Sequence, residues 1–149
     1  MWNEDYREML CALHDADVEF MLVGAYALAS HGFPRATVDL DLWVRPTPEN
    51  SQRICRALAA FGAPMTQISD GDFEKKDMVI QIGVAPRRID LVTSISGVSY
   101  EEASRNAVER EIDGVRVRIL SIQDFIRNKL ATGRPKDLAD VELLRKHTR

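Results

Sequence analysis

Two short segments decide the fold of this chain: Leu22-Val23-Gly24-Ala25 and, after thirteen further residues, Asp39-Leu40-Asp41-Leu42. The apolar run over residues 18–23 predicts a buried strand that ends at the glycine. Residues 37–44 alternate along the chain in the way a strand does, and both aspartates then lie on one face of it. The pattern is therefore a strand, a glycine bend and a second strand that carries two acids.

The rest of the chain predicts further helices and strands around these two segments. Helices are expected over residues 3–16, 26–30 and 121–131, between Thr47 and Gly62, and from residue 134 onward with Leu138, Val141 and Leu144 as the inward stripe. Strands are expected over residues 78–84, 88–93, 107–112 and 115–120, the last two joined by a hairpin at Asp113-Gly114. The predicted fold class is α+β, a single domain with a mixed β-sheet flanked by helices.

Composition limits the protein to a few broad classes. The 149 residues fit one domain, with a core over about residues 18–120 and C-terminal helices over about residues 121–147. The net charge is −3, which argues against a protein that coats DNA generally. The longest apolar run, ten residues, falls short of the roughly 20 that a membrane span needs. The acidic, polar start is unlike a signal peptide, so we expect a cytoplasmic protein without membrane contact.

Cysteines and histidines give no sign of a metal site or a disulfide. Cys11 and Cys55 have no motif spacing, so each is expected to be a small buried hydrophobic side chain and not half of a disulfide or a metal ligand. The three histidines are too scattered along the chain for a zinc site. His31 is expected to mark a helix end, and Trp43 to cover the sheet.

The acidic residues carry the chemistry that the sequence suggests. Asp39 and Asp41 stand two residues apart on one strand, with Cα atoms about 6.6 Å apart at the usual rise. Asp90 lies between Ile89 and Leu91, which would face the core, so its carboxylate would face the opposite side of the sheet. Three carboxylates on one face suit one Mg²⁺ ion, or two ions that share a ligand, with the rest of the coordination supplied by water and substrate phosphates. With two ions, one would activate the attacking hydroxyl and both would neutralise charge on the reacting phosphate.

These segments resemble the signature of the DNA polymerase β-like nucleotidyltransferase superfamily: an apolar residue, glycine and a small residue, followed after a spacer by Asp-apolar-Asp. Residues 24–28, 31–41, 89–91 and 129–140 look like its small bacterial branch, the AbiEii-toxin-like nucleotidyltransferases. The resemblance covers about residues 18–145 and implies the nucleotidyltransferase fold.

By position, the resemblance assigns roles to individual residues. Gly24 and Ala25 would contact nucleotide phosphates, although Ala25 lacks the hydroxyl of the serine that is common there. Asp39 and Asp41 would hold Mg²⁺, and Asp90 would be the third acid, a metal ligand and the activator of the attacking hydroxyl. Lys129 would lie near the triphosphate. Asp137 matches an acid of the family's C-terminal motif.

Several of these residues have an ordinary structural interpretation as well. Asp90 is also a candidate ion-pair partner of Arg87 or Arg88. Lys129 falls on or beside a buried helical stripe, so it should extend outward to solvent or meet an anion. Arg134 is a candidate for binding phosphate or for pairing with Asp137 one turn on. Arg35 is a candidate for contacting the carboxylates or phosphate.

The leading hypothesis is a Mg²⁺-dependent nucleotidyltransferase that moves a nucleoside monophosphate from an NTP to a hydroxyl. The acceptor would be a tRNA end, a protein or a small molecule. A toxin role with an antitoxin protein as partner is implied by the resemblance alone. The alternative is a binding module of the same fold that holds a nucleotide or a partner protein with little turnover. A calcium-binding scaffold is disfavoured because the acids lie on strands and not in a ligand-dense loop.

Overall fold

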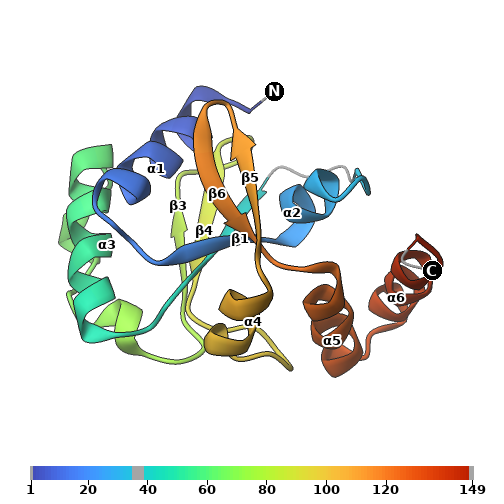
Figure 1. The fold of residues 1–149 in the computed structure, drawn as a ribbon. Helices are drawn as coiled ribbons and strands as arrows, with labels where there is room; N and C mark the ends of the chain where they lie inside the picture. Colours follow the sequence, from blue (N-terminus) through green and yellow to red (C-terminus); the bar gives the residue numbers. More distant parts are fainter. Residues whose placement is uncertain (1, 35–38, 148–149) are drawn as a thin grey trace.

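The computed structural model describes residues 2–34 and 39–147, which form a six-stranded mixed sheet flanked by helices (Figure 1). The helices are α1 (Glu4–Asp15), α2 (Gly24–Ser30), α3 (Pro48–Phe61), α4 (Tyr100–Asn106), α5 (Ile122–Thr132) and α6 (Pro135–His147), with short 3₁₀ turns at Met65–Gln67 and Asp72–Glu74. The strands are β1 (Phe20–Val23), β2 (Asp39–Val44), β3 (Val79–Ile82), β4 (Arg88–Val92), β5 (Val108–Ile112) and β6 (Val115–Ile119). The predicted α+β fold class is confirmed.

The sheet order, β3-β4-β2-β1-β6-β5, places the acid-bearing strands at its centre. β2 runs antiparallel to β1 and parallel to β4. In the β2–β4 register Asp41 lies opposite Asp90 and Asp39 lies opposite Arg88. Because paired residues of neighbouring strands point to the same face, these four side chains share one side of the sheet.

The two faces of the sheet differ in what covers them. Figure 1 shows α1 and α3 on one side, and α2, α5 and α6 on the other. On the face opposite the acids, Leu40 and Leu42 of β2 are fully buried, as are Ile54 and Leu58 of α3. Trp43 shares the acid-bearing face, where its ring meets Tyr100 of α4 edge-on at 5.1 Å. The expectation that Trp43 covers the sheet is therefore confirmed.

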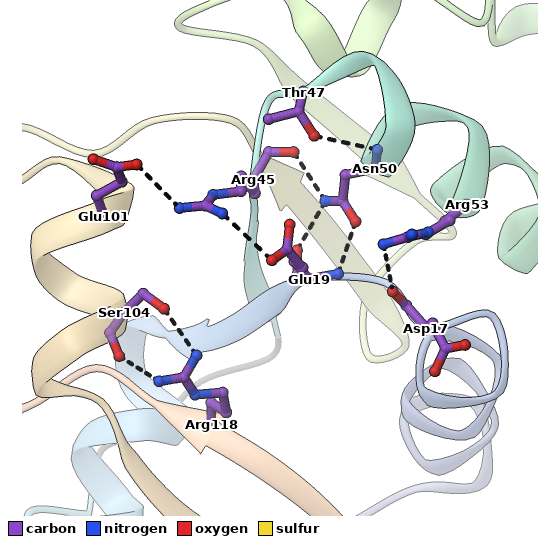
Figure 2. Close-up of polar contacts among 9 residues, drawn as sticks. All are labelled: Asp17, Glu19, Arg45, Thr47, Asn50, Arg53, Glu101, Ser104 and Arg118. Atoms are coloured by element: carbon purple, nitrogen blue, oxygen red, sulfur yellow. Dashed lines mark hydrogen bonds and ion pairs between the residues drawn. The ribbon is translucent and has the colours of Figure 1, made fainter.

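A buried asparagine ties the start of β1 to the end of β2 (Figure 2). Asn50, which is fully buried in α3, accepts a hydrogen bond from the Glu19 backbone N–H at 2.7 Å. Its side-chain amide donates to the carbonyl oxygens of Glu19 and Arg45, each at 2.9 Å. Thr47 caps the helix by accepting from the Asn50 backbone N–H at 3.2 Å. The strand pair that carries Gly24 and Asp41 at its far end is thus held at this end by one side chain.

Two details differ from the sequence expectations. Leu138, expected on the inward stripe of the last helix, is 43% exposed. The buried side chains of α6 are instead Asp137, Asp140, Val141 and Leu144, which recur with helical spacing. The buried stripe thus begins at Asp137, one residue before Leu138, because Asp137 and Asp140 face inward toward α5. The helix α4 and the 3₁₀ turns were not expected, since their short segments carry no sustained apolar period.

Further sequence expectations are confirmed, with the burial of the cysteines as the exception. The hairpin of β5 and β6 turns at Asp113 and Gly114, which both have positive φ. His31 follows the last residue of α2, and its Nε2 lies 2.8 Å from the Leu120 carbonyl oxygen. Cys11 and Cys55 are free thiols and only partly buried, so the expectation that both are buried is wrong. None of the helices within residues 2–34 and 39–147 has the length and apolar character that a membrane crossing requires.

Candidate active site

Gly24 brings the backbone against the carboxylate of Asp41. It follows β1 directly and has a φ of +73°, a conformation that residues with a Cβ rarely adopt. A Cβ at this position would lie 2.4 Å from Asp41 Oδ2. The register of β1 and β2, in which Val23 pairs with Asp41, fixes this approach. Glycine is therefore required here by both conformation and space.

Three carboxylates gather on the same face of β2 and β4. Burial and, to a smaller extent, the nearby charges of Asp90 and Asp39 together raise the pKa of Asp41 to about 6, against the opposing effect of Arg88. Burial disfavours the charged form of the carboxyl, and the two neighbouring carboxylates add to that effect. The three acids named from the sequence thus lie within electrostatic reach of one another.

Arg88 holds the third carboxylate. Its Nε donates to Asp90 Oδ1 and its Nη2 to Asp90 Oδ2, both at 3.0 Å. The same Nε lies 3.8 Å from Asp39 Oδ1. Arg87 points elsewhere and pairs with Asp5 at 3.4 Å. Of the two ion-pair partners that the sequence offered for Asp90, the fold selects Arg88.

A cavity of about 630 Å³ opens beside this acidic centre. Gly24, Ala25 and Asp41 line one side of it. The charged residues that line it from α5, α6 and the turn between them are Lys129, Arg134, Lys136, Asp137 and Asp140. The cavity therefore joins the glycine bend to most of the C-terminal motif, although these segments are about a hundred residues apart. Asp39 and Asp90 do not line it.

Two of the basic groups that line the cavity, Lys129 and Arg134, are engaged by the protein's own acids. Lys129 Nζ lies 2.9 Å from Asp140 Oδ2 and 3.6 Å from Asp137 Oδ1. Arg134 Nε donates to Asp137 Oδ2 at 2.6 Å. Hydrogen bonds from Thr132 and Arg134 and the charge of Lys129 lower the pKa of Asp137. Lys129 thus meets an anion, as one of the two sequence interpretations required, and Arg134 pairs with Asp137.

Tyr6 is a residue of the site that the sequence did not reveal. Its hydroxyl donates to the backbone oxygens of Arg88 at 3.0 Å and Pro86 at 3.2 Å. Burial, together with the charges of Tyr26, Asp39 and Asp41, raises the pKa of Tyr6 to about 12. In the sequence Tyr6 is only one member of an apolar helical stripe, so nothing there separates it from its neighbours. Arg35, which the sequence did single out, lies outside the described residues.

The donor set fits a divalent cation at Asp39 and Asp41. Both supply hard carboxylate oxygens from one strand face, and a cation between them would offset the mutual repulsion of their charges. Asp90 differs, because both of its oxygens already accept hydrogen bonds from Arg88. Among the described residues, no group of three or more His, Cys, Asp and Glu side chains has an arrangement suited to a metal.

Comparisons with known proteins agree with this geometry. A solved structure from Thermotoga maritima, described as a candidate nucleotidyltransferase, matches with a TM-score of 0.60 and 15% identity, over 99% of this chain and 95% of that chain, which shows the fold. No curated protein matches the chain significantly. The model of the family DUF6036, described as a nucleotidyltransferase of unknown function, matches residues 4–145 and so includes both the acidic centre and the cavity. The chain therefore belongs to the DUF6036 nucleotidyltransferase family.

Proposed function

We propose that the protein transfers a nucleoside monophosphate from an NTP to a hydroxyl group, with Mg²⁺ held by Asp39 and Asp41. The observation that carries the proposal is the packing of Asp41 against Gly24 at the wall of a cavity that Lys129, Arg134 and Lys136 also line. A nucleotide triphosphate needs these three features together: a close backbone approach, oxygen ligands for the metal, and cations for its phosphates.

In the proposed reaction the acceptor oxygen bonds to the α-phosphorus while the bond from that phosphorus to the β-phosphate oxygen breaks. Pyrophosphate leaves, and the hydroxyl proton passes to water, because Asp90, the base that the resemblance suggests, is held by Arg88 and does not line the cavity. Bound Mg²⁺ supplies charge neutralisation at the reacting phosphate. Lys129 and Arg134 line the part of the cavity where the β- and γ-phosphates would lie. A bound triphosphate would therefore replace Asp140 as the partner of Lys129 and Asp137 as the partner of Arg134. Ala25 would offer its backbone N–H, and Arg35 a further positive charge.

The test is incubation with radiolabelled NTPs and Mg²⁺ over three acceptor classes: bulk tRNA, protein and small hydroxyl compounds. The expected result is label transfer to one class, abolished in Asp39→Ala. Asp15→Ala, at an exposed acid at the end of α1, is the matched control and should transfer normally. Nucleotide binding without transfer to any acceptor would contradict the proposal.

A second candidate, a binding module with little turnover, is favoured by the ion pairs of the site. Arg88 and Asp90 neutralise each other's charge in the described structure, and so do Lys129 and Asp140. A module of this kind would bind nucleotide, and Asp39→Ala would weaken that binding. No label would appear on any acceptor. Membership of the AbiEii-like branch and a cytoplasmic toxin role are finer proposals; growth arrest on expression that Asp39→Ala relieves would support them.

A further inference from the structure

Arg88 places a permanent positive charge inside the group of three carboxylates. We propose that the Arg88 guanidinium takes the place of one divalent cation, so that the acidic centre binds a single metal ion through Asp39 and Asp41. Asp90 then serves as the anchor of Arg88 and not as a metal ligand. The inference rests on the proposed nucleotidyl transfer and specifies how many cations that reaction uses on this chain.

The geometry of the pair supports this assignment. Both oxygens of Asp90 accept from Arg88, in the two-pronged arrangement that a guanidinium makes with a carboxylate. The Asp90 side chain is only 9% exposed, so little of it is open to an ion that must bring its own waters. Asp39 and Asp41 are more accessible, and Asp41 lines the cavity where a nucleotide would enter.

Electrostatics argues in the same direction. An arginine stays charged at any physiological pH, so Arg88 cannot release Asp90 by losing a proton. A cation bound by Asp90 would approach the guanidinium closely, and like charges repel strongly where water is scarce. Arg88 also lies 3.8 Å from Asp39, so its charge extends over both strands. Three carboxylates, one guanidinium and one divalent cation carry no net charge.

The backbone of Arg88 is held in place as well as its side chain. Residue 88 pairs with Asp39 in the parallel β2–β4 ladder. Its carbonyl oxygen accepts from the hydroxyl of Tyr6, a fully buried residue of α1. Residues 88 and 90 are two apart on β4, so their side chains lie on the same face of the sheet and the guanidinium of Arg88 reaches the carboxylate of Asp90. The guanidinium is therefore a built part of the centre.

The experiment counts protein-bound Mn²⁺ by electron paramagnetic resonance, with a saturating non-hydrolysable NTP analogue. The wild-type protein should bind one Mn²⁺ per chain, and Asp39→Ala should weaken that binding at least about tenfold. Arg88→Ala frees Asp90 and should raise the count to two. Arg87→Ala removes the neighbouring arginine, whose partner Asp5 lies on α1, and should leave the count at one.

The outcomes separate this inference from the proposed function. Two Mn²⁺ per wild-type chain would overturn the inference while nucleotidyl transfer stands, as would an unchanged count in folded Arg88→Ala. No bound Mn²⁺ together with no label transfer would overturn the proposed function itself. Should Arg88→Ala fail to fold, the wild-type count still decides, because it requires no variant.

Discussion

Asp41 is the residue at which burial and charge oppose each other most clearly. Its pKa is raised from 3.8 to about 6, so the folded protein binds a proton there more tightly than the unfolded chain does. Between about pH 4 and pH 6 the folded state therefore holds more protons, and the free energy of unfolding falls as pH rises. Well above pH 6 the carboxyl is ionised in both the folded and the unfolded state, and the free energy of unfolding falls no further on its account.

Asp41→Asn removes this penalty. Without metal, in EDTA, the variant should be more stable than the wild type at pH 7 by about 1–3 kcal/mol. Its stability should also lack the decline between pH 4 and pH 6. Thermal denaturation across that range measures both effects, with Asp15→Asn as an exposed control. If the stability of wild type and variant changed with pH in the same way, the ionised Asp41 would not destabilise the folded state, and the prediction would be wrong.

Gly24→Ala tests the close approach of backbone and carboxylate. The added Cβ would collide with Asp41 Oδ2, and the positive φ adds strain of about 1–2 kcal/mol. We expect a loss of at least about 2 kcal/mol of stability and loss of nucleotide binding. Gly62→Ala is the matched control: its φ is +95°, but its Cβ would meet nothing within 4 Å. Equal effects of the two substitutions in urea denaturation and nucleotide titration would exclude a special role for Gly24.

At the scale of elements, Asp137 joins α5 to α6. It accepts hydrogen bonds from Thr132 at 2.7 Å and Arg134 at 2.6 Å, and Lys129 lies 3.6 Å away. Asp137→Asn should lower the free energy of unfolding by about 1–3 kcal/mol, because the mostly buried ammonium group of Lys129 loses one of its two carboxylate partners. Since the pKa of Asp137 is lowered, its contribution is present above pH 4 and is lost in more acidic solution.

The control for this prediction lies one residue further along α6. Leu138→Ala alters a side chain that is 43% exposed, and should change stability by no more than about 0.5 kcal/mol. Urea denaturation at pH 7 and pH 3 compares the two variants. A difference between Asp137→Asn and wild type that persists unchanged at pH 3 would contradict the electrostatic account.

Asn50 links α3 to the ends of β1 and β2. Asn50→Ala removes the acceptor of the Glu19 backbone N–H and one of the two donors to each of the carbonyl oxygens of Glu19 and Arg45, so we expect a loss of about 1–3 kcal/mol. Arg53→Ala removes an exposed 3.5 Å contact to the Asp17 carbonyl oxygen and should cost no more than about 0.5 kcal/mol (Figure 2). Chemical denaturation measures both, and equal losses would assign the effect to the surface of α3 and not to the buried amide.

At the scale of the whole molecule, one apolar core connects the first helix to the last. It includes Leu10 of α1, Leu22 of β1, Phe125 of α5 and Leu144 of α6. Because these side chains pack together, we expect the chain to unfold in one cooperative step. In a Trp2→Phe variant, the fluorescence of buried Trp43 and the far-ultraviolet circular dichroism should give the same midpoint. An earlier loss of helical signal would mean that α5 and α6 unfold independently of the sheet.

Local patterns predicted much of the fold and part of the site. The strand before Gly24, the alternation around Asp39 and the turn at Asp113 each depend on a few neighbouring residues. Helix α4 and the inward stripe of α6 were missed or misplaced, since a short helix has weak periodicity and buried acids imitate an exposed face. Gly24 and Asp41, both predicted from the sequence as site residues, lie next to each other in the fold, because a two-residue period places the acid on a definite face.

The sequence by itself determined the order of the six strands and of every α-helix except α4, the glycine bend, and the common face of Asp39 and Asp41. These are consequences of backbone periodicity and of the conformations open to glycine. Only the tertiary structure decided that Arg88 clasps Asp90, that Lys129 meets Asp140, and that Tyr6 holds the carbonyl of Arg88. Each of these contacts depends on how strands pair and helices pack across the sheet, and that register is set by the whole core acting together.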